Sequence, residues 1–231
     1  MNLFSNYYLY FKNHGFKYVI FRASKSLEYK VRKFLARVQG KNEISTIYNG
    51  EYYEDISNLP NMNRFIDELY NYFQPKTLLD VGCGNGPYLR EFLKRGVDAQ
   101  GVDGSDWAKQ NALVDPKYIQ VFDLRKKLEL GKKFDLVICI EVAEHLQAKF
   151  ASTLVGNMTR HADKLFFTAA IPGQGGDDHI NEQPNEYWIK LFEEQGFEYK
   201  KEDTMKMRES LKEKKVAWWL SQNAMIFIKN K

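Results

Sequence analysis

The sequence has little of several residue types whose abundance would define a class of protein. Of its 231 residues only two are cysteines, Cys83 and Cys139, and two cysteines so far apart give no metal-ligand spacing. A domain held together by disulfides is therefore not expected. The low cysteine content instead predicts a reducing, cytoplasmic location. No apolar run reaches the about 18 residues that suggest a membrane-spanning helix. Asn, Lys, His and Gly interrupt the first 21 residues, so no signal peptide is predicted.

A strong charge of one sign is also missing. The 34 Lys and Arg residues exceed the 30 Asp and Glu residues by only four, and a net charge of +4 is well below that of a dedicated nucleic-acid binder. Hydrophobic residues make up 44% of the chain and charged residues 28%, which indicates a packed core and not a disordered chain. The length favours one α/β domain with a small extension over two full-sized domains.

The positive charge that is present gathers near the start of the chain. Residues 12–41 hold nine Lys or Arg and one acid, and residues 26–38 have the periodicity of an amphipathic helix. The apolar positions of that helix are Leu27, Val31, Phe34, Leu35 and Val38. We predict that residues 1–60 form a basic, aromatic-rich helical extension of a main domain at 61–231. The helix is expected to pack its apolar side on that domain; the alternatives are a lid over the substrate and peripheral contact of residues 1–45 with the inner face of the membrane.

The rest of the chain alternates between short apolar stretches and helical ones. After a helix at Met62 to Phe73, strands are predicted at residues 77–81, 99–103, 117–124, 133–140, 164–171, 196–203 and 223–230. Helices are predicted between them at residues 87–95, 105–113, 144–158, 185–195 and 205–215. This alternation indicates βαβ units and a parallel sheet covered on both faces.

A glycine-rich turn, in the stretch LLDVGCGNGPYL, follows the first of these strands. Gly82, Gly84 and Gly86 remove side chains, so that backbone can approach a bulky ligand. A nicotinamide or flavin site would need its third glycine at position 87, where Pro87 stands instead, suited to the first turn of a helix. The pattern therefore argues against a hydride-carrying cofactor.

Three acids stand at the ends of successive strands. Asp80 precedes the glycine turn, where a carboxylate favours a cationic ligand group over a pyrophosphate. Asp103 lies 19 residues after Gly84, at the position of an acid that binds both hydroxyls of a ribose. Asp123 ends the next strand and is placed to accept a hydrogen bond from an exocyclic amine. Together the acids indicate a nucleoside that carries a positive group.

With these motifs and FDLVICIEVAEHL in this order, the chain from about Met62 onward resembles the class I S-adenosylmethionine-dependent methyltransferases. The resemblance implies a Rossmann-like, doubly wound α/β fold with a seven-stranded, mostly parallel sheet in the order 3-2-1-4-5-7-6. It also implies S-adenosylmethionine as cofactor, with its methionine part at the first motif, its ribose at the second strand and its adenine at the third. The implied cofactor-binding residues are Asp80, Gly82, Cys83, Gly84, Asn85, Gly86, Asp103, Gly104, Ser105, Asp123, Leu124, Glu141 and Val142. An α/β domain whose glycines serve only tight turns is the alternative.

Candidate catalytic residues follow the fourth and fifth strands. Methyl transfer requires alignment and, where the acceptor must lose a proton, a base. Glu141, Glu144 and His145 are spaced i, i+3, i+4, which places them on one face if a helix begins at the strand end. His179 lies in a Gly- and Asp-rich loop that reaches the same edge of the sheet. We predict Glu144, His145 and His179 as catalytic residues.

The same three residues are candidate ligands for Mg²⁺ or another divalent cation, which would chelate a vicinal diol and lower the pKa of one hydroxyl. The arrangement of E-x-x-E-H with a distal His is similar to that of small-RNA terminal 2′-O-methyltransferases, and ubiquinone-pathway O-methyltransferases share the E-x-x-E-H part. Simpler roles remain open for each residue: Glu141 lines the cofactor, Glu144 faces a helix dipole, and His145 makes a structural hydrogen bond. In that case no metal binds.

The end of the chain bears on the acceptor. HINEQPNEYWIKLFEEQGF and WWLSQNAMIF resemble methyltransferases found in bacterial surface-glycan and secondary-metabolite gene clusters. Tyr187, Trp188, Trp218 and Trp219 either stack on a sugar or other flat acceptor or pack in the core.

Three functions are compatible with these motifs. The favoured one is O-methylation of a hydroxyl on a small molecule or a sugar or glycan precursor. The second is 2′-O-methylation of RNA ribose through a metal at the E-x-x-E-H motif. The third is a non-catalytic cofactor-binding interaction subunit, which the intact glycine turn and ribose acid disfavour.

Overall fold

The computed structural model describes residues 61–176 and 178–230, together with Val31, Leu35, Val38 and Leu59. The rest of the extension predicted at residues 1–60 lies outside the described residues. Val31, Leu35 and Val38 are helical, as predicted, and their side chains are 48%, 47% and 67% exposed. The expected burial of the apolar side of this helix is therefore wrong for these three residues.

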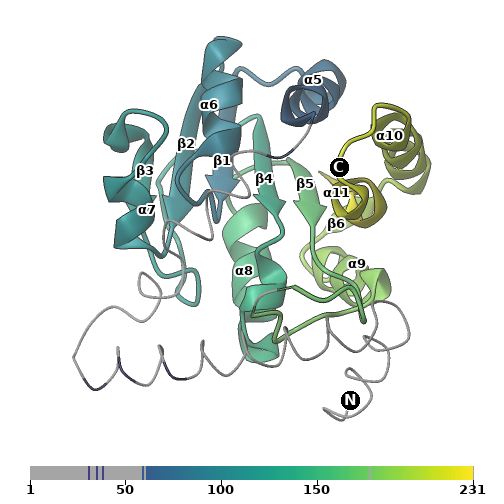
Figure 1. Cartoon of the computed structure of the whole chain (residues 1–231). Coiled ribbons are helices and arrows are strands. Elements are labelled where there is room, and N and C mark those ends of the chain that lie inside the picture. Colours follow the sequence, from purple (N-terminus) through teal and green to yellow (C-terminus); the bar gives the residue numbers. More distant parts are fainter. Residues whose placement is uncertain are drawn as a thin grey trace, which may run out of the picture.

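The main domain is built on one seven-stranded sheet with the order β3-β2-β1-β4-β5-β7-β6, which confirms the predicted doubly wound fold (Figure 1). The strands are β1 (Thr77–Val81), β2 (Asp98–Asp103), β3 (Ile119–Val121), β4 (Leu136–Ile140), β5 (Lys164–Thr168), β6 (Phe197–Tyr199) and β7 (Met225–Lys229). Only β7 runs against its neighbours, pairing antiparallel with both β5 and β6. The carboxyl ends of β1 to β5 therefore meet at one edge of the sheet.

Helices cover both faces of this sheet. They are α5 (Met62–Phe73), α6 (Pro87–Lys94), α7 (Asp106–Gln110), α8 (Ala151–Thr159), α9 (Asn185–Glu193), α10 (Lys201–Glu213) and α11 (Trp218–Asn223). None of the helices in the described part of the chain is long and apolar enough to cross a bilayer.

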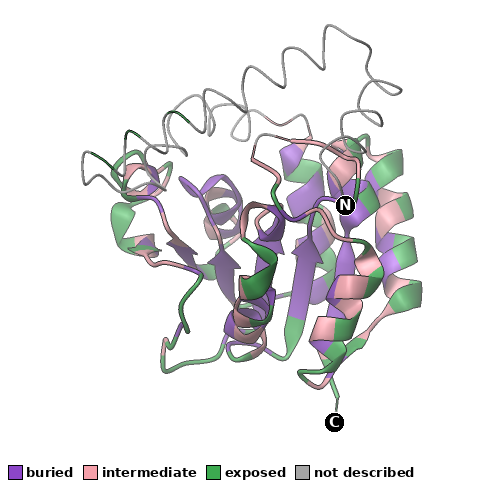
Figure 2. Cartoon of the chain, turned by 90° about the horizontal axis from the view of Figure 1, so that it is seen from below, coloured by how far each residue is buried: buried purple, intermediate pink, exposed green. Residues whose placement is uncertain are grey.

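Strand side chains alternate between two core clusters, one on each face. In β1, Leu78 belongs to one cluster and Leu79 to the other, and Phe166 and Phe167 of β5 divide in the same way. Helices α5, α6, α10 and α11 complete the first cluster, and α8 and α9 complete the second. This alternation makes the strands the buried middle layer of the domain (Figure 2).

The segment after β4 differs from the helix predicted over residues 144–158. Two 3₁₀ turns, Ala143–His145 and Ala148–Phe150, come first, and α8 begins only at Ala151. In an α-helix the carbonyl oxygen of Glu144 would accept from the N–H four residues later. It accepts instead from two N–H groups of a distant loop, at 2.9 and 3.0 Å, so the turn belongs to a loop junction.

Two other predicted boundaries also shift. The strand predicted over residues 196–203 ends at Tyr199, and α10 begins at Lys201. The Thr204 hydroxyl accepts a hydrogen bond from the backbone of β7 at 3.0 Å, which anchors the first turn of α10 beside the sheet edge. Helix α11 was not predicted, because its six residues are too few to show a helical period.

Candidate functional site

The glycine turn brings the ends of β1 and β4 into contact. Gly82, Gly84 and Gly86 all have positive φ, at 83°, 54° and 85°. A Cβ atom on Gly82 would lie 2.4 Å from Cγ2 of Val142, so the turn after β1 packs directly on the residue that follows Glu141. Two segments predicted to bind the cofactor are thus adjacent, and Pro87 begins α6 as predicted.

Asp103 ties the glycine turn to the end of β2. Its carboxylate accepts hydrogen bonds from the N–H groups of Gly84 at 2.9 Å and Ser105 at 2.8 Å. The Ser105 hydroxyl in turn caps α7 by accepting from the N–H of Ala108 at 3.2 Å. The predicted ribose acid and the predicted methionine-binding turn therefore share one backbone network.

Asp80 is a buried carboxyl group that lacks a full set of partners. Its side chain is 1% exposed, and its Oδ2 atom has no hydrogen-bond partner among the described residues. Burial, and then the nearby charge of Asp103, raises the pKa of Asp80 well above its ordinary value. The Oδ1 atom of Asn85 in the adjacent turn is likewise buried without a partner. A ligand with a cationic group and hydrogen-bond donors would satisfy both side chains.

Asp123, the predicted adenine acid, is engaged by a cation of its own chain. Arg125 binds both carboxylate oxygens with its side chain, at 2.8 Å each. The Arg125 guanidinium holds the pKa of Asp123 below its ordinary value. The neighbouring Leu124 is buried and its carbonyl accepts from Asn157, so this loop is fixed to α8. Contact of Asp123 with adenine stays a prediction.

Glu141 directly follows β4 and has a left-handed conformation, with φ of 52°. Its N–H donates to Thr168 at the end of β5, and its carboxylate accepts from the side chains of Gln174 at 3.0 Å and Asn223 at 3.1 Å. Glu141 therefore does not share a helical face with Glu144, as the i, i+3, i+4 spacing suggested. It belongs instead to a network that joins β4, the loop after β5 and α11.

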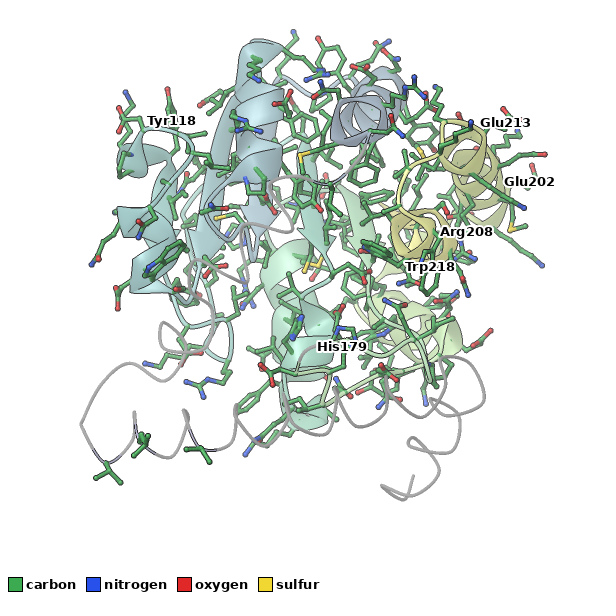
Figure 3. All side chains as sticks on the ribbon, viewed as in Figure 1. Tyr118, His179, Glu202, Arg208, Glu213 and Trp218 are labelled. Carbon is green, nitrogen blue, oxygen red and sulfur yellow. The ribbon has the colours of Figure 1, made fainter. Side chains whose placement is uncertain are left out.

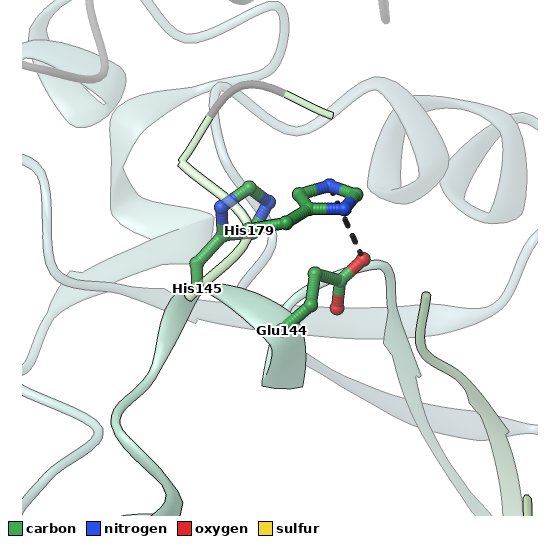
Figure 4. Close-up of side chains that lie close together, drawn as sticks. All are labelled: Glu144, His145 and His179. Atoms are coloured by element: carbon green, nitrogen blue, oxygen red, sulfur yellow. Dashed lines mark ion pairs between the residues drawn. The ribbon is translucent and has the colours of Figure 1, made fainter. Parts of the chain in front are cut away.

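The structure brings Glu144, His145 and His179 together (Figure 4), and Figure 3 labels His179 in the whole chain. One ligand atom of each lies within 4.8 Å of those of the other two, and the two imidazole centroids are 5.0 Å apart at an interplanar angle of 80°. Nε2 of His179 is 4.0 Å from Oε1 of Glu144, as the dashed line in Figure 4 marks. The predicted convergence of these residues from two separate strand ends is thus observed.

Burial determines the charge of this cluster. Glu144 is fully buried, and neither of its carboxylate oxygens has a hydrogen-bond partner in the described part of the chain. Burial, and then the charge of Glu141, raises the pKa of Glu144 well above its ordinary value. Burial, and then the nearby His179, lowers the pKa of His145 to about 3. At neutral pH His145 is therefore uncharged, and protonation of Glu144 is favoured.

The loop that carries His179 is fixed by its own backbone and by a residue that the sequence analysis did not assign. Ile180 and Asn181 donate their N–H groups to the carbonyl oxygen of Glu144 at 2.9 and 3.0 Å. Oε1 of Glu182 lies 3.2 Å from Nδ1 of His179, and the Glu182 carboxylate accepts from two glycine N–H groups of the same loop. The i, i+3 spacing of His179 and Glu182 in a glycine-rich loop was the available signal. The neighbouring Asp177 lies outside the described residues.

The aromatic residues near the end of the chain separate into core and surface. Trp188 is fully buried, with its ring centroid 5.2 Å from that of Phe167, so packing in the core is its role. Trp218 is 52% exposed at the start of α11, beside the partly buried Trp219. Of these side chains, the exposed Trp218 is the one positioned to meet another molecule.

Comparison with known families agrees with this geometry. A family model described as "Methyltransferase domain" matches residues 48–162, which include β1 to β4 and the turns after them.

Curated relatives match over part of their length. A ubiquinone biosynthesis O-methyltransferase from Rickettsia felis is 32% identical over 99 residues, which are 38% of this chain and 39% of that protein. One from Acinetobacter baumannii is 29% identical over 148 residues, 58% of this chain and 55% of that protein. The chain therefore spans between about two fifths and about half of the length of these relatives.

Solved structures share the fold at low sequence identity. The sugar N-methyltransferase KedS8 from Streptoalloteichus is 15% identical, with a TM-score of 0.60 over 78% of this chain and 92% of that one. The plantazolicin methyltransferase BpumL, solved with a substrate analogue and SAH, is 16% identical, with a TM-score of 0.57 over 90% of this chain and 99% of that one. At these identities the similarity establishes a common fold.

Proposed function

We propose that the chain is a class I methyltransferase that methylates a hydroxyl group of a small molecule or of a sugar or glycan precursor, a proposal supported by the match to a methyltransferase domain and by the order of the sheet. The observation that carries this proposal is the cluster of Glu144, His145 and His179 at the carboxyl end of the sheet, one turn beyond the predicted cofactor segment Glu141 and Val142. The two imidazoles lie beside the proposed cofactor site, where one of them can remove the proton of an acceptor hydroxyl.

The residues around the glycine turn fit S-adenosylmethionine. When bound, this cofactor supplies a methyl group activated by a positively charged sulfur. The partnerless Oδ2 of Asp80 meets the need of a cationic methionine part for a buried acceptor, and the three glycines leave room for it. Asp103 is proposed to bind the ribose hydroxyls, and Asp123 to face the adenine.

His179 is the proposed general base. Its Nδ1 faces Glu182, so its Nε2 is the nitrogen that faces Glu144 and takes the proton of the acceptor hydroxyl. S-adenosylmethionine, when bound, would supply the methyl group and keep the electrons of its carbon–sulfur bond on sulfur, while Nε2 of His179 takes up the proton that the acceptor hydroxyl loses. His145 is a weaker base, because burial lowers its pKa to about 3.

A divalent cation is a second way to activate the hydroxyl. Glu144, His145 and His179 offer one carboxylate and two imidazoles, a donor set that suits several divalent metals. A bound cation would supply a Lewis acid for the hydroxyl and would stabilise Glu144 as an anion. EDTA separates the two mechanisms: methylation by the base alone survives chelation, and methylation through a metal is lost and returns with added Mg²⁺.

The decisive experiment is a methyl-transfer screen over sugar nucleotides, catechols, polyols and short RNAs, with and without EDTA. His179→Ala is expected to lower kcat by about 10²- to 10⁴-fold and to leave S-adenosylmethionine binding, measured by calorimetry, unchanged. Glu186→Ala, on the exposed first turn of α9, is the matched control and should keep full activity. A fully active His179→Ala enzyme would show that His179 is not the base.

The RNA alternative is tested in the same screen. Transfer to RNA, with binding that weakens steeply as salt is added, would replace the small-molecule proposal.

We place the enzyme in the cytoplasm, and binding of anionic vesicles by residues 1–45 would add a peripheral membrane location. Cofactor binding without transfer to any acceptor class would favour the non-catalytic interaction subunit.

A further inference from the structure

His179 is held by contacts to both of its ring nitrogens. Nδ1 lies 3.2 Å from Oε1 of Glu182, and Nε2 lies 4.0 Å from Oε1 of Glu144. The His179 side chain is 11% exposed and that of Glu182 is 9% exposed, so little water competes for the closer contact. The orientation of the ring is therefore set by protein groups.

Both carboxylate oxygens of Glu182 face backbone N–H groups of this loop. Its Oε2 accepts from the N–H of Gly173 at 2.8 Å, and its Oε1 from the N–H of Gly175 at 2.7 Å. Acceptance from two backbone N–H groups favours the ionised form of Glu182. A carboxylate cannot donate, so the hydrogen of the contact with His179 must be on Nδ1.

Gly176 packs closely against the His179 ring near Nε2 and Cε1. A Cβ atom at position 176 would lie 2.0 Å from Nε2 and 2.1 Å from Cε1 of His179, so the imidazole occupies the space of a side chain there. The φ of Gly176 is not among the positive values of its neighbours Gly173 and Gly175. Its requirement for glycine is therefore steric and concerns His179 itself.

We propose that Glu182 is a positioning residue that, together with Gly176, holds His179 as the Nδ1-protonated tautomer with Nε2 free to act toward Glu144 and the acceptor. The inference rests on the proposed function for its role in catalysis, but the tautomer and the orientation rest on the loop geometry alone. A neutral histidine released from such a partner has two tautomers available, and only one of them presents a lone pair at Nε2. Glu182 thus selects the tautomer that can accept a proton, or bind a cation, at that atom.

A purely structural role for Glu182 predicts something different. If Glu182 only clamped the loop through Gly173 and Gly175, its loss would lower thermal stability without selecting the protonated nitrogen of His179. The measurement must therefore show which ring nitrogen of His179 carries the proton.

The test is ¹⁵N NMR of the full chain with labelled histidine at pH 8, with the His179 signal among the four histidines assigned by its loss in His179→Gln. We expect wild-type His179 to carry its proton on Nδ1. In Glu182→Ala we expect a shift toward the Nε2-protonated form and, with an accepted substrate, a loss of about 10- to 100-fold in kcat with little change in KM for the cofactor. Glu186→Ala, four residues after Glu182 and exposed, is the control and should change neither signal nor kcat.

Gly176→Ala provides an independent variant that leaves the carboxylate in place. It should displace His179 and lower kcat by a comparable factor. Two results would overturn the proposal: a proton on Nε2 of His179 in the wild-type protein, or an unchanged tautomer of His179 in Glu182→Ala. The wild-type spectrum tests the proposal even if a variant does not fold. If the tautomer is as expected but no acceptor is methylated, the proposed function fails and the positioning of His179 stands.

Discussion

Asp80 is expected to favour cofactor binding and to lower the stability of the folded chain without cofactor. Its carboxyl group is buried, one oxygen has no partner in the described structure, and burial with the charge of Asp103 raises its pKa. Below pH about 4 the group is protonated in the folded and the unfolded chain alike. As the pH rises above that value the unfolded chain ionises first, so stability is lost until the folded pKa is reached.

Asp80→Asn should therefore stabilise the chain without cofactor and weaken cofactor binding. The gain in melting temperature over wild type should be about 4 °C at pH 8 and smaller at pH 5, because asparagine does not ionise. The dissociation constant for S-adenosylmethionine should rise by about tenfold or more. Calorimetric scans at both pH values and a binding titration provide the measurements; a variant less stable than wild type at pH 8 would contradict the argument.

Gly82 is required for both its conformation and its space. Gly82→Ala combines a φ of 83° with a Cβ atom 2.4 Å from Val142, so we expect a loss of about 3 kcal/mol in the free energy of unfolding. Gly96→Ala is the matched control, since Gly96 has a φ of 76° and nothing within 4 Å of an added Cβ, and should lose about 1 kcal/mol. Urea unfolding of both variants separates the two effects, and equal losses would mean that the contact with Val142 is unimportant.

Among the elements, the strands could be predicted because their apolar residues are local in sequence, whereas the order of the sheet was implied by the resemblance to a known family. The fully buried β4 reads as a continuous apolar run, and the acids Asp80, Asp103 and Asp123 lie at or near the strand ends where doubly wound sheets bind ligands. Helix α5 was predicted with its observed bounds, since its apolar positions repeat with a helical period.

The turn after β4 could not be predicted, because a distant loop determines it. The carbonyl oxygen of Glu144 accepts from Ile180 and Asn181, which are 36 and 37 residues further along the chain. Local spacing suggested one helix that would carry both Glu141 and Glu144, but Glu141 precedes the 3₁₀ turn and its carboxylate accepts from Gln174 and Asn223. The sequence predicted correctly that Glu144, His145 and His179 meet at the ends of β4 and β5. It predicted wrongly that the segment after β4 is an α-helix.

Helix α8 fixes the loop after β3 through one buried amide. Asn157 accepts from the N–H of Leu128 at 2.8 Å and donates to the carbonyls of Lys126 at 2.9 Å and Leu124 at 3.3 Å. Asn157→Leu leaves these backbone groups buried without partners, so we expect a loss of about 3 kcal/mol in the free energy of unfolding.

The matched control for this change is Ser152→Ala, on the exposed side of the same helix, which should lie within about 0.5 kcal/mol of wild type. Because the loop also carries Asp123, the Asn157→Leu variant should bind S-adenosylmethionine more weakly. Chemical unfolding and a binding titration test both parts, and unchanged stability in Asn157→Leu would show that the amide does not hold the loop.

At the scale of the whole molecule, the described part of the chain has a complete layered core. Both faces of the sheet are covered by helices that lie after residue 61, and the two clusters are filled by their side chains. The family match nevertheless begins at residue 48, ahead of the boundary that we predict between residues 60 and 61. Leu59 also packs against the first cluster, so the position of this boundary is open to experiment.

Two shortened chains, 48–231 and 61–231, determine what the extension contributes. Since the described residues after position 60 fill both core clusters, with Leu59 packed only at the side of one, we expect both chains to fold, with melting temperatures within about 3 °C of the full chain, and to bind S-adenosylmethionine with similar affinity. If the extension is a lid, kcat/KM for the acceptor should fall in both chains while cofactor affinity is kept, because a lid excludes water from the transfer step and not from the glycine turn. Folding of 48–231 but not of 61–231 would move the domain boundary to the start of the family match.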